Sequence, residues 1–188
     1  MDALEALYTR RSIRAYRDEP VPPDVIKKIL KAGLAAPSGG NCQPWRFVVV
    51  TDREKIEKFD PQDHQPWVER APAVIVVCAN PMDSWEKYGA DDDCFILDTA
   101  AAIENMLLAI HALGLGSVWI LSFSKEAVRE TLGIPNPWKI VSIVPFGYYD
   151  PDGVSEYKGR RLLNSAVRPR RPLGEVAFLN SPDEPLEE

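Results

Sequence analysis

The 188-residue sequence has few of the side chains that build metal centres, with only three cysteines and two histidines. The cysteines, Cys42, Cys78 and Cys94, are odd in number and widely spaced, and they form no C-x-x-C pair and no cysteine/histidine zinc pattern. Neither histidine stands in a recognisable arrangement with a serine or a cysteine, which argues against a catalytic triad. We therefore expect no bound metal and no nucleophilic triad.

The chain also lacks a signal-peptide core and an excess of positive charge. Its N-terminus, M-D-A-L-E-A-L-Y, is acidic, and together with the sparse cysteines it favours a reducing cytoplasm. A formal net charge of −6 argues against nucleic acid as a partner. The most apolar segment, 96–113, contains Asp98, Glu104, Asn105 and His111, which a membrane span tolerates poorly. We expect a buried helix there and no membrane partner.

Helices and strands are mixed along the chain without strict β–α–β alternation, which favours a single α+β domain with a layered sheet between helices. The hydrophobic pattern predicts helices over residues 2–11, 24–34, 53–59, 94–113 and 124–132. It predicts strands over residues 47–50, 73–79, 117–121 and 140–148. Residues 150–188 hold only one short apolar run, 176–179, so this tail must dock on something or be disordered.

Three arginines lie within the five residues of the motif R-R-S-I-R, which spans Arg10 to Arg14. A helix that ended here would bring Arg10 and Arg14 to one side, at positions i and i+4. Arginine binds phosphate through bidentate contacts, so the motif is a candidate phosphate site. The alternative is a solvated basic helix end that complements the helix dipole.

A loop of small and amide residues, P-S-G-G-N-C-Q-P, spans residues 37–44. Gly39 and Gly40 permit close approach of the backbone to a ligand. Asn41 and Gln43 each offer a donor and an acceptor, which suits the pyrimidine edge of a flavin or a base. The alternative is a helix C-cap followed by a tight turn, and in either case we expect Trp45 to be buried behind the loop.

A second basic cluster, Arg168, Arg170 and Arg171, lies in the tail around Pro169 and Pro172. Taken alone it favours a disordered polar tail. With the upstream arginines present, both clusters can converge on one dianionic phosphate. The two clusters and the small loop together suggest a protein that holds a flavin nucleotide.

In this order the motifs resemble the FMN-dependent nitroreductase family. The resemblance runs from residue 4 to residue 176 through R-R-S-x-R, P-S-x-x-N-x-Q-P-W, A-A-x-E-N-x-L-L-A, L-G-L-G-S-x-W-I, L-G-I-P and R-P-R-R-P-L. It implies a three-layer α/β/α sandwich with a mainly antiparallel central sheet and an intertwined homodimer with FMN at its interface. It also implies that the 94–113 helix packs on its symmetry mate, and that the tail wraps the partner and adds residues 176–179 as an edge strand.

The same resemblance implies a role for each site residue. Arg10 and Ser12 would lie near the FMN phosphate and ribityl chain, Arg14 near N1 and O2 of the ring, and the backbone of Leu121 and Ser122 near N5. The loop would frame the ring edge or come from the neighbouring subunit. The predicted cofactor-binding set is Arg10, Arg11, Ser12, Arg14, Pro37, Ser38, Gly39, Asn41, Gln43, Leu121, Ser122, Arg168 and Arg170.

The implied activity is reduction of nitroaromatics, quinones or similar small acceptors by NADH or NADPH, in a ping-pong sequence of hydride transfers through FMN. No acid–base side chain is expected to be indispensable, and Arg14 would act electrostatically. The segment 80–93, which covers the substrate face in the family, is short in this chain. Two alternatives remain open: a flavin-fragmenting or dehalogenating enzyme on the same scaffold, and a non-catalytic FMN-binding protein.

Overall fold

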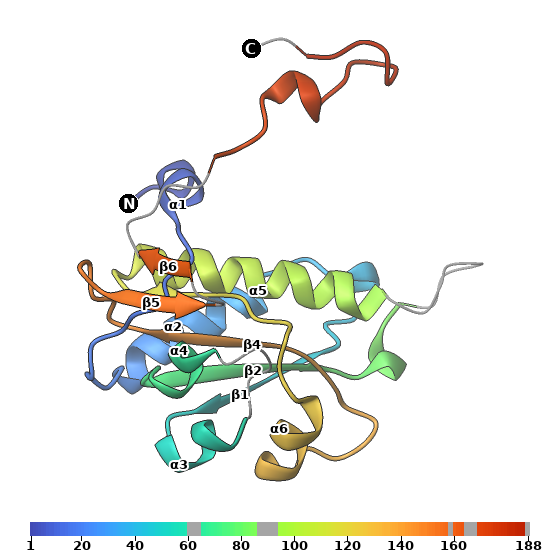
Figure 1. Ribbon diagram of the computed structural model, residues 1–188. Helices are drawn as coiled ribbons and strands as arrows, with labels where there is room; N and C mark the ends of the chain where they lie inside the picture. Colours follow the sequence, from blue (N-terminus) through green and yellow to red (C-terminus); the bar gives the residue numbers. More distant parts are fainter. Residues whose placement is uncertain (60–64, 86–93, 158–159, 164–168, 187–188) are drawn as a thin grey trace.

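A computed structural model of the chain describes residues 1–59, 65–85, 94–157, 160–163 and 169–186. Its centre is a four-stranded antiparallel sheet in the order β1-β2-β4-β3 (Figure 1). The strands are β1 Trp45–Val50, β2 Ala73–Ala79, β3 Gly116–Ser117 and β4 Lys139–Gly147. All seven residues of β2 are buried, because this strand lies between β1 and β4 and is covered on both faces.

Six α-helices are present in the described parts of the chain: α1 Ala3–Thr9, α2 Pro23–Leu34, α3 Arg53–Ile56, α4 Pro66–Glu69, α5 Cys94–Ala112 and α6 Lys125–Leu132. Single 3₁₀ turns occur at η1 Gly39–Asn41, η2 Glu57–Phe59, η3 Pro81–Asp83 and η4 Leu173–Glu175. A hairpin of β5 Val154–Tyr157 and β6 Arg160–Leu163 follows the sheet.

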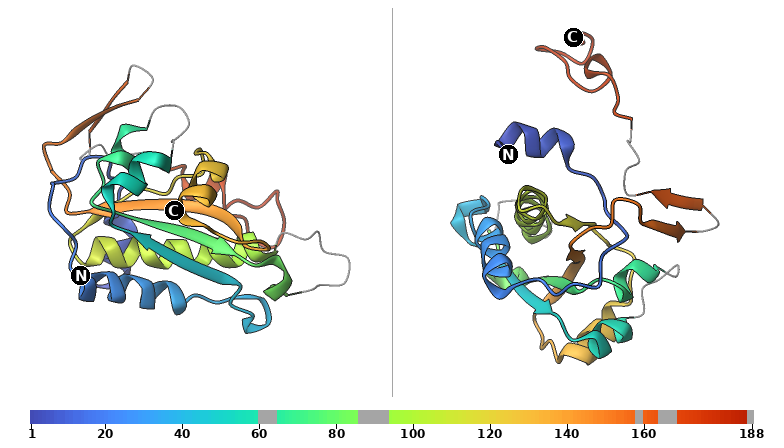
Figure 2. Two further views of the ribbon diagram at one scale, coloured as in Figure 1. Left: turned by 90° about the horizontal axis from the view of Figure 1, so that it is seen from below. Right: turned by 90° about the vertical axis from the view of Figure 1, so that its left-hand side faces the viewer.

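Helices cover both faces of the sheet and make three layers (Figure 2). On one face, Ile29 of α2 and Ile103 of α5 belong to the same buried cluster as Ile75 of β2. On the other face, Ile56 of α3 and Val128 of α6 cluster with neighbouring residues of β2, whose side chains alternate between the faces. The three-layer α+β arrangement predicted from the sequence is confirmed.

The 19-residue helix α5 is the only helix in the described part of the chain that is long and apolar enough to cross a membrane. Ile103, Met106 and Ile110 are fully buried in the cluster that α5 forms with α2 and the sheet. The core helix of a soluble protein has the same length and composition. The prediction of a buried helix in this segment is therefore confirmed.

Two of the predicted helix starts are fixed by side-chain caps. Asp2 Oδ1 accepts a 2.9 Å hydrogen bond from the backbone N–H of Glu5, and Ser124 Oγ accepts one of 3.1 Å from Ala127. These bonds satisfy N–H groups that have no partner within the first helical turn. The predicted boundaries at residues 24–34 and 124–132 agree with the observed helices to within one residue.

Two predicted segments differ from the structure. The first helix ends at Thr9 rather than near Arg11. The strand predicted over residues 117–121 is reduced to Gly116–Ser117 and an isolated bridge between Ile120 and Ile143. The hydrogen-bond ladder between β3 and β4 is interrupted at Val118. Its N–H donates to the carbonyl of Pro145, but proline has no N–H to donate a bond back.

The tail also departs from the prediction. The sequence pattern gave no strand in residues 150–163, where the β5–β6 hairpin forms. The apolar run 176–179 makes no strand within this chain, since it follows η4 and contributes only an isolated bridge between Phe178 and Pro185. The tail leaves the body beyond α1, as both views show (Figures 1 and 2).

Candidate functional site

The R-R-S-I-R motif forms an extended segment beside the sheet. The backbone N–H of Ile13 donates a 2.8 Å hydrogen bond to Ser117 O, and that of Arg17 donates one of 2.8 Å to Tyr148 O. Alternate residues of an extended chain point to opposite sides. Ile13 is buried, and alternation predicts Arg10, Ser12 and Arg14 on the opposite side. The helix ends at Thr9, so the helical i, i+4 spacing offered for Arg10 and Arg14 was wrong. Their convergence on one phosphate stays a prediction.

The two neighbouring arginines of this motif have different partners. Arg10 forms an ion pair with Glu104 of α5, with 3.7 Å between Nε and Oε1, and its side chain is 20% exposed. Arg11 turns back toward α1, and its Nη1 donates 2.8 Å hydrogen bonds to the carbonyls of Tyr8 and Arg10. Arg10 therefore contacts α5, whereas Arg11 contacts the end of α1.

The side chain of Arg14 is held by an aromatic ring. Its guanidinium carbon lies 5.6 Å from the ring centroid of Trp67, a buried residue of α4, and its Nη1 donates to Ser12 O over 3.4 Å. Beside it, the hydroxyl of Tyr16 donates to the carbonyls of Ile13 and Pro145, at 2.8 and 3.2 Å. Burial raises the pKa of Tyr16 well above its usual value, against the opposing effect of Arg14, so Tyr16 remains a hydrogen-bond donor.

The turn that contains Leu121 and Ser122 lies against the start of α4. Both residues are exposed, and the side-chain amide of Gln65 donates a 2.8 Å hydrogen bond to the carbonyl oxygen of Ser122. Gln65 and Trp67 thus hold two predicted site elements, the 121–122 turn and Arg14, from one short helix. The structure brings these two elements together.

The loop at residues 37–43 is shaped by its own hydrogen bonds. Gly40, Asn41 and Gln43 have positive φ angles of 54°, 59° and 50°, a region that glycine and asparagine enter most readily. Ser38 Oγ accepts a 3.0 Å hydrogen bond from the N–H of Gln43, and the amide of Gln43 donates to Asn41 O and Oδ1. Asn41 and Gln43 are exposed, so a formed loop presents amide groups to a ligand.

Asp98 and Trp85 restrain this loop, and Trp45 is buried next to it in sequence. Asp98 Oδ1 of α5 accepts a 2.9 Å hydrogen bond from the N–H of Gly39. The ring of Trp85 lies so close to Gly40 that a Cβ there would be 2.0 Å from ring atom Cε3. Trp45 is 3% exposed, which confirms the prediction that it is buried behind the loop.

The loop and the arginine segment contact different parts of α5. Gly39 is bonded to Asp98, near the start of the helix, whereas Arg10 is paired with Glu104 in its middle, and Thr9 is bonded to His111 near its end, with 2.8 Å between Oγ1 and Nε2. Asp98 lies six residues before Glu104 and thirteen before His111, which correspond to about 9 and about 20 Å of helix. These contacts separate the loop from the arginine segment within one chain.

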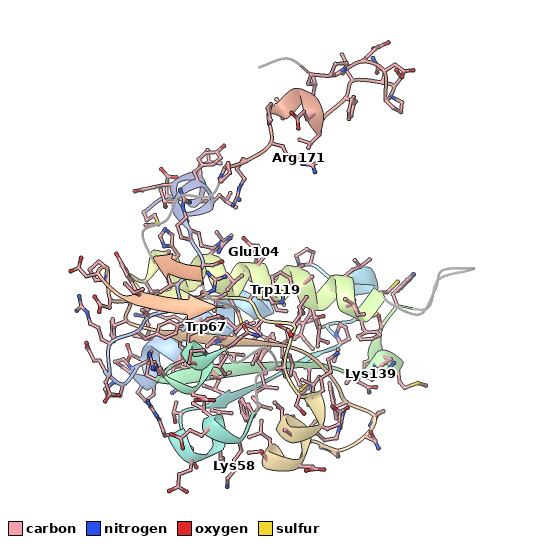
Figure 3. All side chains as sticks on the ribbon, viewed as in Figure 1. Lys58, Trp67, Glu104, Trp119, Lys139 and Arg171 are labelled. Carbon is pink, nitrogen blue, oxygen red and sulfur yellow. The ribbon has the colours of Figure 1, made fainter. Side chains whose placement is uncertain are left out.

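The structure does not test the predicted role of the tail arginines. Arg168 lies outside the described residues. The ion-pair partner of Arg10 among the described residues is Glu104, and Arg170 is exposed. Its neighbour Arg171 stands on the projecting tail, well away from Glu104 (Figure 3). Completion of the phosphate site by these residues stays a prediction.

Sequence reasoning did not select Gln65, Trp67, Trp85 or Asp98 as site residues. Two signals were available. Pro66 is the first residue of α4, a preferred position for proline, and this proline is a weak signal because Pro44 in the same Q-P-W sequence precedes strand β1. Asp98 is an ionisable residue within an otherwise apolar run, and such residues are buried only when they have a partner.

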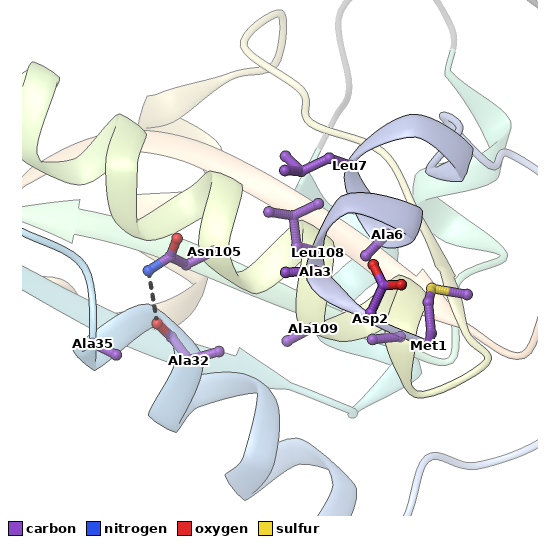
Figure 4. Close-up of a pocket in the computed structure, with 11 residues that line it drawn as sticks. Met1, Asp2, Ala3, Ala6, Leu7, Ala32, Ala35, Asn105, Leu108 and Ala109 are labelled. Atoms are coloured by element: carbon purple, nitrogen blue, oxygen red, sulfur yellow. Dashed lines mark hydrogen bonds between the residues drawn. The ribbon is translucent and has the colours of Figure 1, made fainter.

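A separate groove of about 330 Å³ lies between α1, α2 and α5 (Figure 4). Ala6 and Leu7 of α1 face Leu108 and Ala109 of α5 across it, and Asn105 Nδ2 donates a 3.2 Å hydrogen bond to Ala32 O at its edge. The lining is almost entirely apolar, so the groove does not suit the phosphate of a nucleotide.

A family model described as Nitroreductase family matches residues 7–67 and 60–148 of the chain. A protein of Archaeoglobus fulgidus, provisionally named an NADH dehydrogenase/NAD(P)H nitroreductase, is 45% identical over 152 residues, which cover 78% of this chain and 85% of that protein. A 5,6-dimethylbenzimidazole synthase of Rhodospirillum rubrum is 28% identical, with coverages of 78% and 82%.

Among solved structures, an FMN-dependent nitroreductase of Clostridium difficile is 32% identical and superposes with a TM-score of 0.69, over 78% of this chain and 87% of that one. The family match covers both the R-R-S-I-R segment and the 37–43 loop, whose geometry is described above. The chain therefore belongs to the nitroreductase family.

Proposed function

We propose that this protein is an FMN-dependent oxidoreductase that uses NADH or NADPH to reduce small electron acceptors. The observation that carries the proposal is that the R-R-S-I-R segment runs beside the sheet edge, with Ile13 bonded to Ser117, in a chain of the nitroreductase family. Bound FMN would supply the redox chemistry, accepting a hydride and passing reducing equivalents to the acceptor. The residues of the chain bind and orient the cofactor.

Arg10 and Ser12 bind the phosphate end of the cofactor in this proposal. The Arg10 guanidinium already has an anionic partner in Glu104, and a phosphate dianion offers it a stronger one through bidentate contacts. Arg11 is bonded to the end of α1, so we assign it a supporting role rather than direct contact. Arg168 and Arg170 complete the phosphate site from the tail.

Arg14 supplies a fixed positive charge to the pyrimidine side of the ring. The Trp67 ring and the Ser12 carbonyl hold the guanidinium in place, so little reorganisation is needed when negative charge develops on the ligand. The exposed N–H groups at Leu121 and Ser122 lie on a turn held by Gln65. We assign no indispensable acid–base side chain.

We propose that the working form is a homodimer in which the 37–43 loop of one subunit completes the arginine half of the other. The separation of the two halves along α5 supports this. Exposed apolar side chains support it as well, because Leu4, Leu7 and Tyr8 on α1 are at least 50% exposed, as are Val176 and Leu179 on the tail. In the proposed dimer the tail wraps the partner subunit.

Nitroaromatics and quinones are the acceptor classes we propose, used in alternation with NAD(P)H at one site. The sparse, unpaired cysteines support a cytoplasmic location. A second candidate is a flavin-fragmenting enzyme, favoured by the similarity to a 5,6-dimethylbenzimidazole synthase. Product analysis after anaerobic reduction separates the two, because an oxidoreductase returns intact FMN.

The deciding experiment is spectroscopic. The purified protein is expected to be yellow, to take up FMN, and to lose its flavin absorbance when NADH or NADPH is added without oxygen. Regain of colour on addition of a quinone completes the cycle. A colourless protein that takes up no FMN would overturn the proposal, and a flavoprotein that no pyridine nucleotide reduces would establish the binding-protein alternative. Gel filtration tests the dimer.

A further inference from the structure

Asp98 is a buried carboxyl whose only hydrogen-bond partner in the described structure is the loop at residues 37–43. Its side chain lies on α5, the residue is 8% exposed, and Oδ1 accepts the 2.9 Å hydrogen bond from Gly39 N–H. The second oxygen, Oδ2, is buried without a hydrogen-bond partner. Burial of a carboxyl with half of its bonding capacity unused is unfavourable, so its retention requires a reason beyond packing.

The ordinary structural roles of a helical aspartate do not apply to Asp98. It lies in the second turn of α5, whose first residue is Cys94, so it does not cap the helix. No ion pair within the described residues includes it. The adjacent Thr99 shows the usual arrangement, because its hydroxyl donates back to the carbonyls of Phe95 and Ile96 within the helix.

The bond from Gly39 fixes the loop at the point where it changes direction. Ser38 is extended, Gly39 begins the turn η1, and Gly40 follows with φ of 54°. Trp85 also packs against Gly39 and Gly40, so this ring and Asp98 both restrain the turn. Beyond the restrained Gly39, Asn41 is exposed.

We propose that Asp98 is a positioning residue for the cofactor. It holds the 37–43 loop in its ligand-ready conformation before FMN binds, by accepting the Gly39 hydrogen bond. The inference rests on the proposed function for its ligand, and on the described contacts for the anchor itself. Asp98 acts through the loop and does not touch the reacting atoms.

Three variants test this proposal. Asp98→Leu removes the acceptor and leaves the Gly39 N–H without its partner. Asp98→Asn keeps an acceptor oxygen, so it separates the hydrogen bond from the charge. Thr99→Val is the matched control, because it removes a buried polar group from the neighbouring residue of α5 without altering a contact to the loop.

Two measurements are made on each full-length variant. Hydrogen–deuterium exchange of the 37–43 segment without FMN reports the anchor directly, and quenching of FMN fluorescence gives the dissociation constant. Asp98→Leu is expected to lose loop protection and to bind FMN about tenfold more weakly, as for one buried donor left unpaired. Asp98→Asn should restore both to within about twofold of wild type, and Thr99→Val should change neither.

The outcomes separate the anchor from the proposed function. Unchanged loop protection and FMN affinity in Asp98→Leu would overturn the inference, as would an Asp98→Asn variant as impaired as Asp98→Leu. A wild-type protein that binds no FMN overturns the proposed function, and the exchange data then still decide whether Asp98 holds the loop. If Asp98→Leu does not fold, Asp98→Ala removes the same acceptor without added bulk, and the same readouts decide.

Discussion

The side-chain amide of Gln65 donates a 2.8 Å hydrogen bond to the carbonyl oxygen of Ser122, and Gln65 is 7% exposed. This bond fixes the turn whose backbone N–H groups are proposed to face the redox-active part of the cofactor. In Gln65→Met the shape is nearly kept and the donor is lost. We expect anaerobic reduction by NADH, followed by stopped-flow absorbance, to slow about fivefold, equivalent to about 1 kcal/mol.

Lys125→Met provides the control for this prediction. Lys125 is exposed at the start of α6, three residues beyond Ser122, and within the described parts of the chain no side-chain hydrogen bond or ion pair joins it to the turn. Its reduction rate should match wild type. Equal slowing in Lys125→Met and Gln65→Met would show that the effect comes from general perturbation of this region rather than from the bond to Ser122.

Arg14 and Arg170 are predicted to fail in opposite ways. Arg14→Ala removes the charge that Trp67 holds beside the site, so it should slow flavin reduction more than it weakens FMN binding. Arg170→Ala removes a phosphate contact, so it should weaken binding more than it slows reduction. FMN titration and single-turnover reduction measure the two quantities separately.

Arg171→Ala is the matched control, since Arg171 is the adjacent exposed arginine of the tail and is not in the predicted set. It should bind FMN as wild type does. If Arg171→Ala and Arg170→Ala lose FMN affinity equally, the tail acts only as a nonspecific basic segment. Parallel loss of rate and affinity in Arg14→Ala would contradict its electrostatic role.

Much of the fold could be predicted because hydrophobic patterns record burial. Residues 73–79 are apolar at every position, and β2 has these bounds because it is the covered strand at the sheet centre. Asp2 and Ser124 mark helix starts through local side-chain bonds. The β3 strand could not be predicted, since it ends where a distant proline, Pro145, interrupts its partner.

Only part of the candidate site could be predicted, because sequence patterns record local contacts and not contacts between distant residues. Arg10, Ser12 and Arg14 form a motif in the sequence, and the structure places this motif beside the sheet through the bond from Ile13 to Ser117. Gln65 and Asp98 hold site elements 57 and 59 residues away along the chain, and no local pattern records such contacts. The physical separation of the 37–43 loop from the arginines also depends on tertiary structure alone.

His111 is predicted to make stability depend on pH. Burial lowers its pKa below the usual 6.5, and Arg10 and Arg11 lower it further, while Glu5 opposes them. The unfolded chain therefore binds a proton more readily than the folded protein, so the free energy of unfolding decreases as pH falls below 6.5 toward the folded-state pKa. Urea unfolding at several pH values above and below 6.5 measures this slope.

His111→Gln is the variant that isolates this effect, because it keeps a polar partner for Thr9 and cannot be protonated. Its free energy of unfolding should change less with pH in this range than that of wild type. Glu5→Gln removes the one acidic group that raises the pKa of His111, so it should steepen the dependence. Identical pH profiles for wild type and His111→Gln would exclude His111 as the source.

Gly40 and Gly133 make a matched pair for testing what the loop glycine does. Both have positive φ angles, 54° and 63°, so alanine at either position costs about 1 kcal/mol or slightly more in backbone strain. A Cβ at Gly133 meets nothing within 4 Å, whereas one at Gly40 would overlap the Trp85 ring. Urea unfolding should show a similar decrease in the free energy of unfolding from backbone strain in both variants. Only Gly40→Ala should also weaken FMN binding, because displacement of Trp85 removes its contact with the 37–43 loop. Retention of full FMN affinity in Gly40→Ala would mean that Trp85 does not hold the loop.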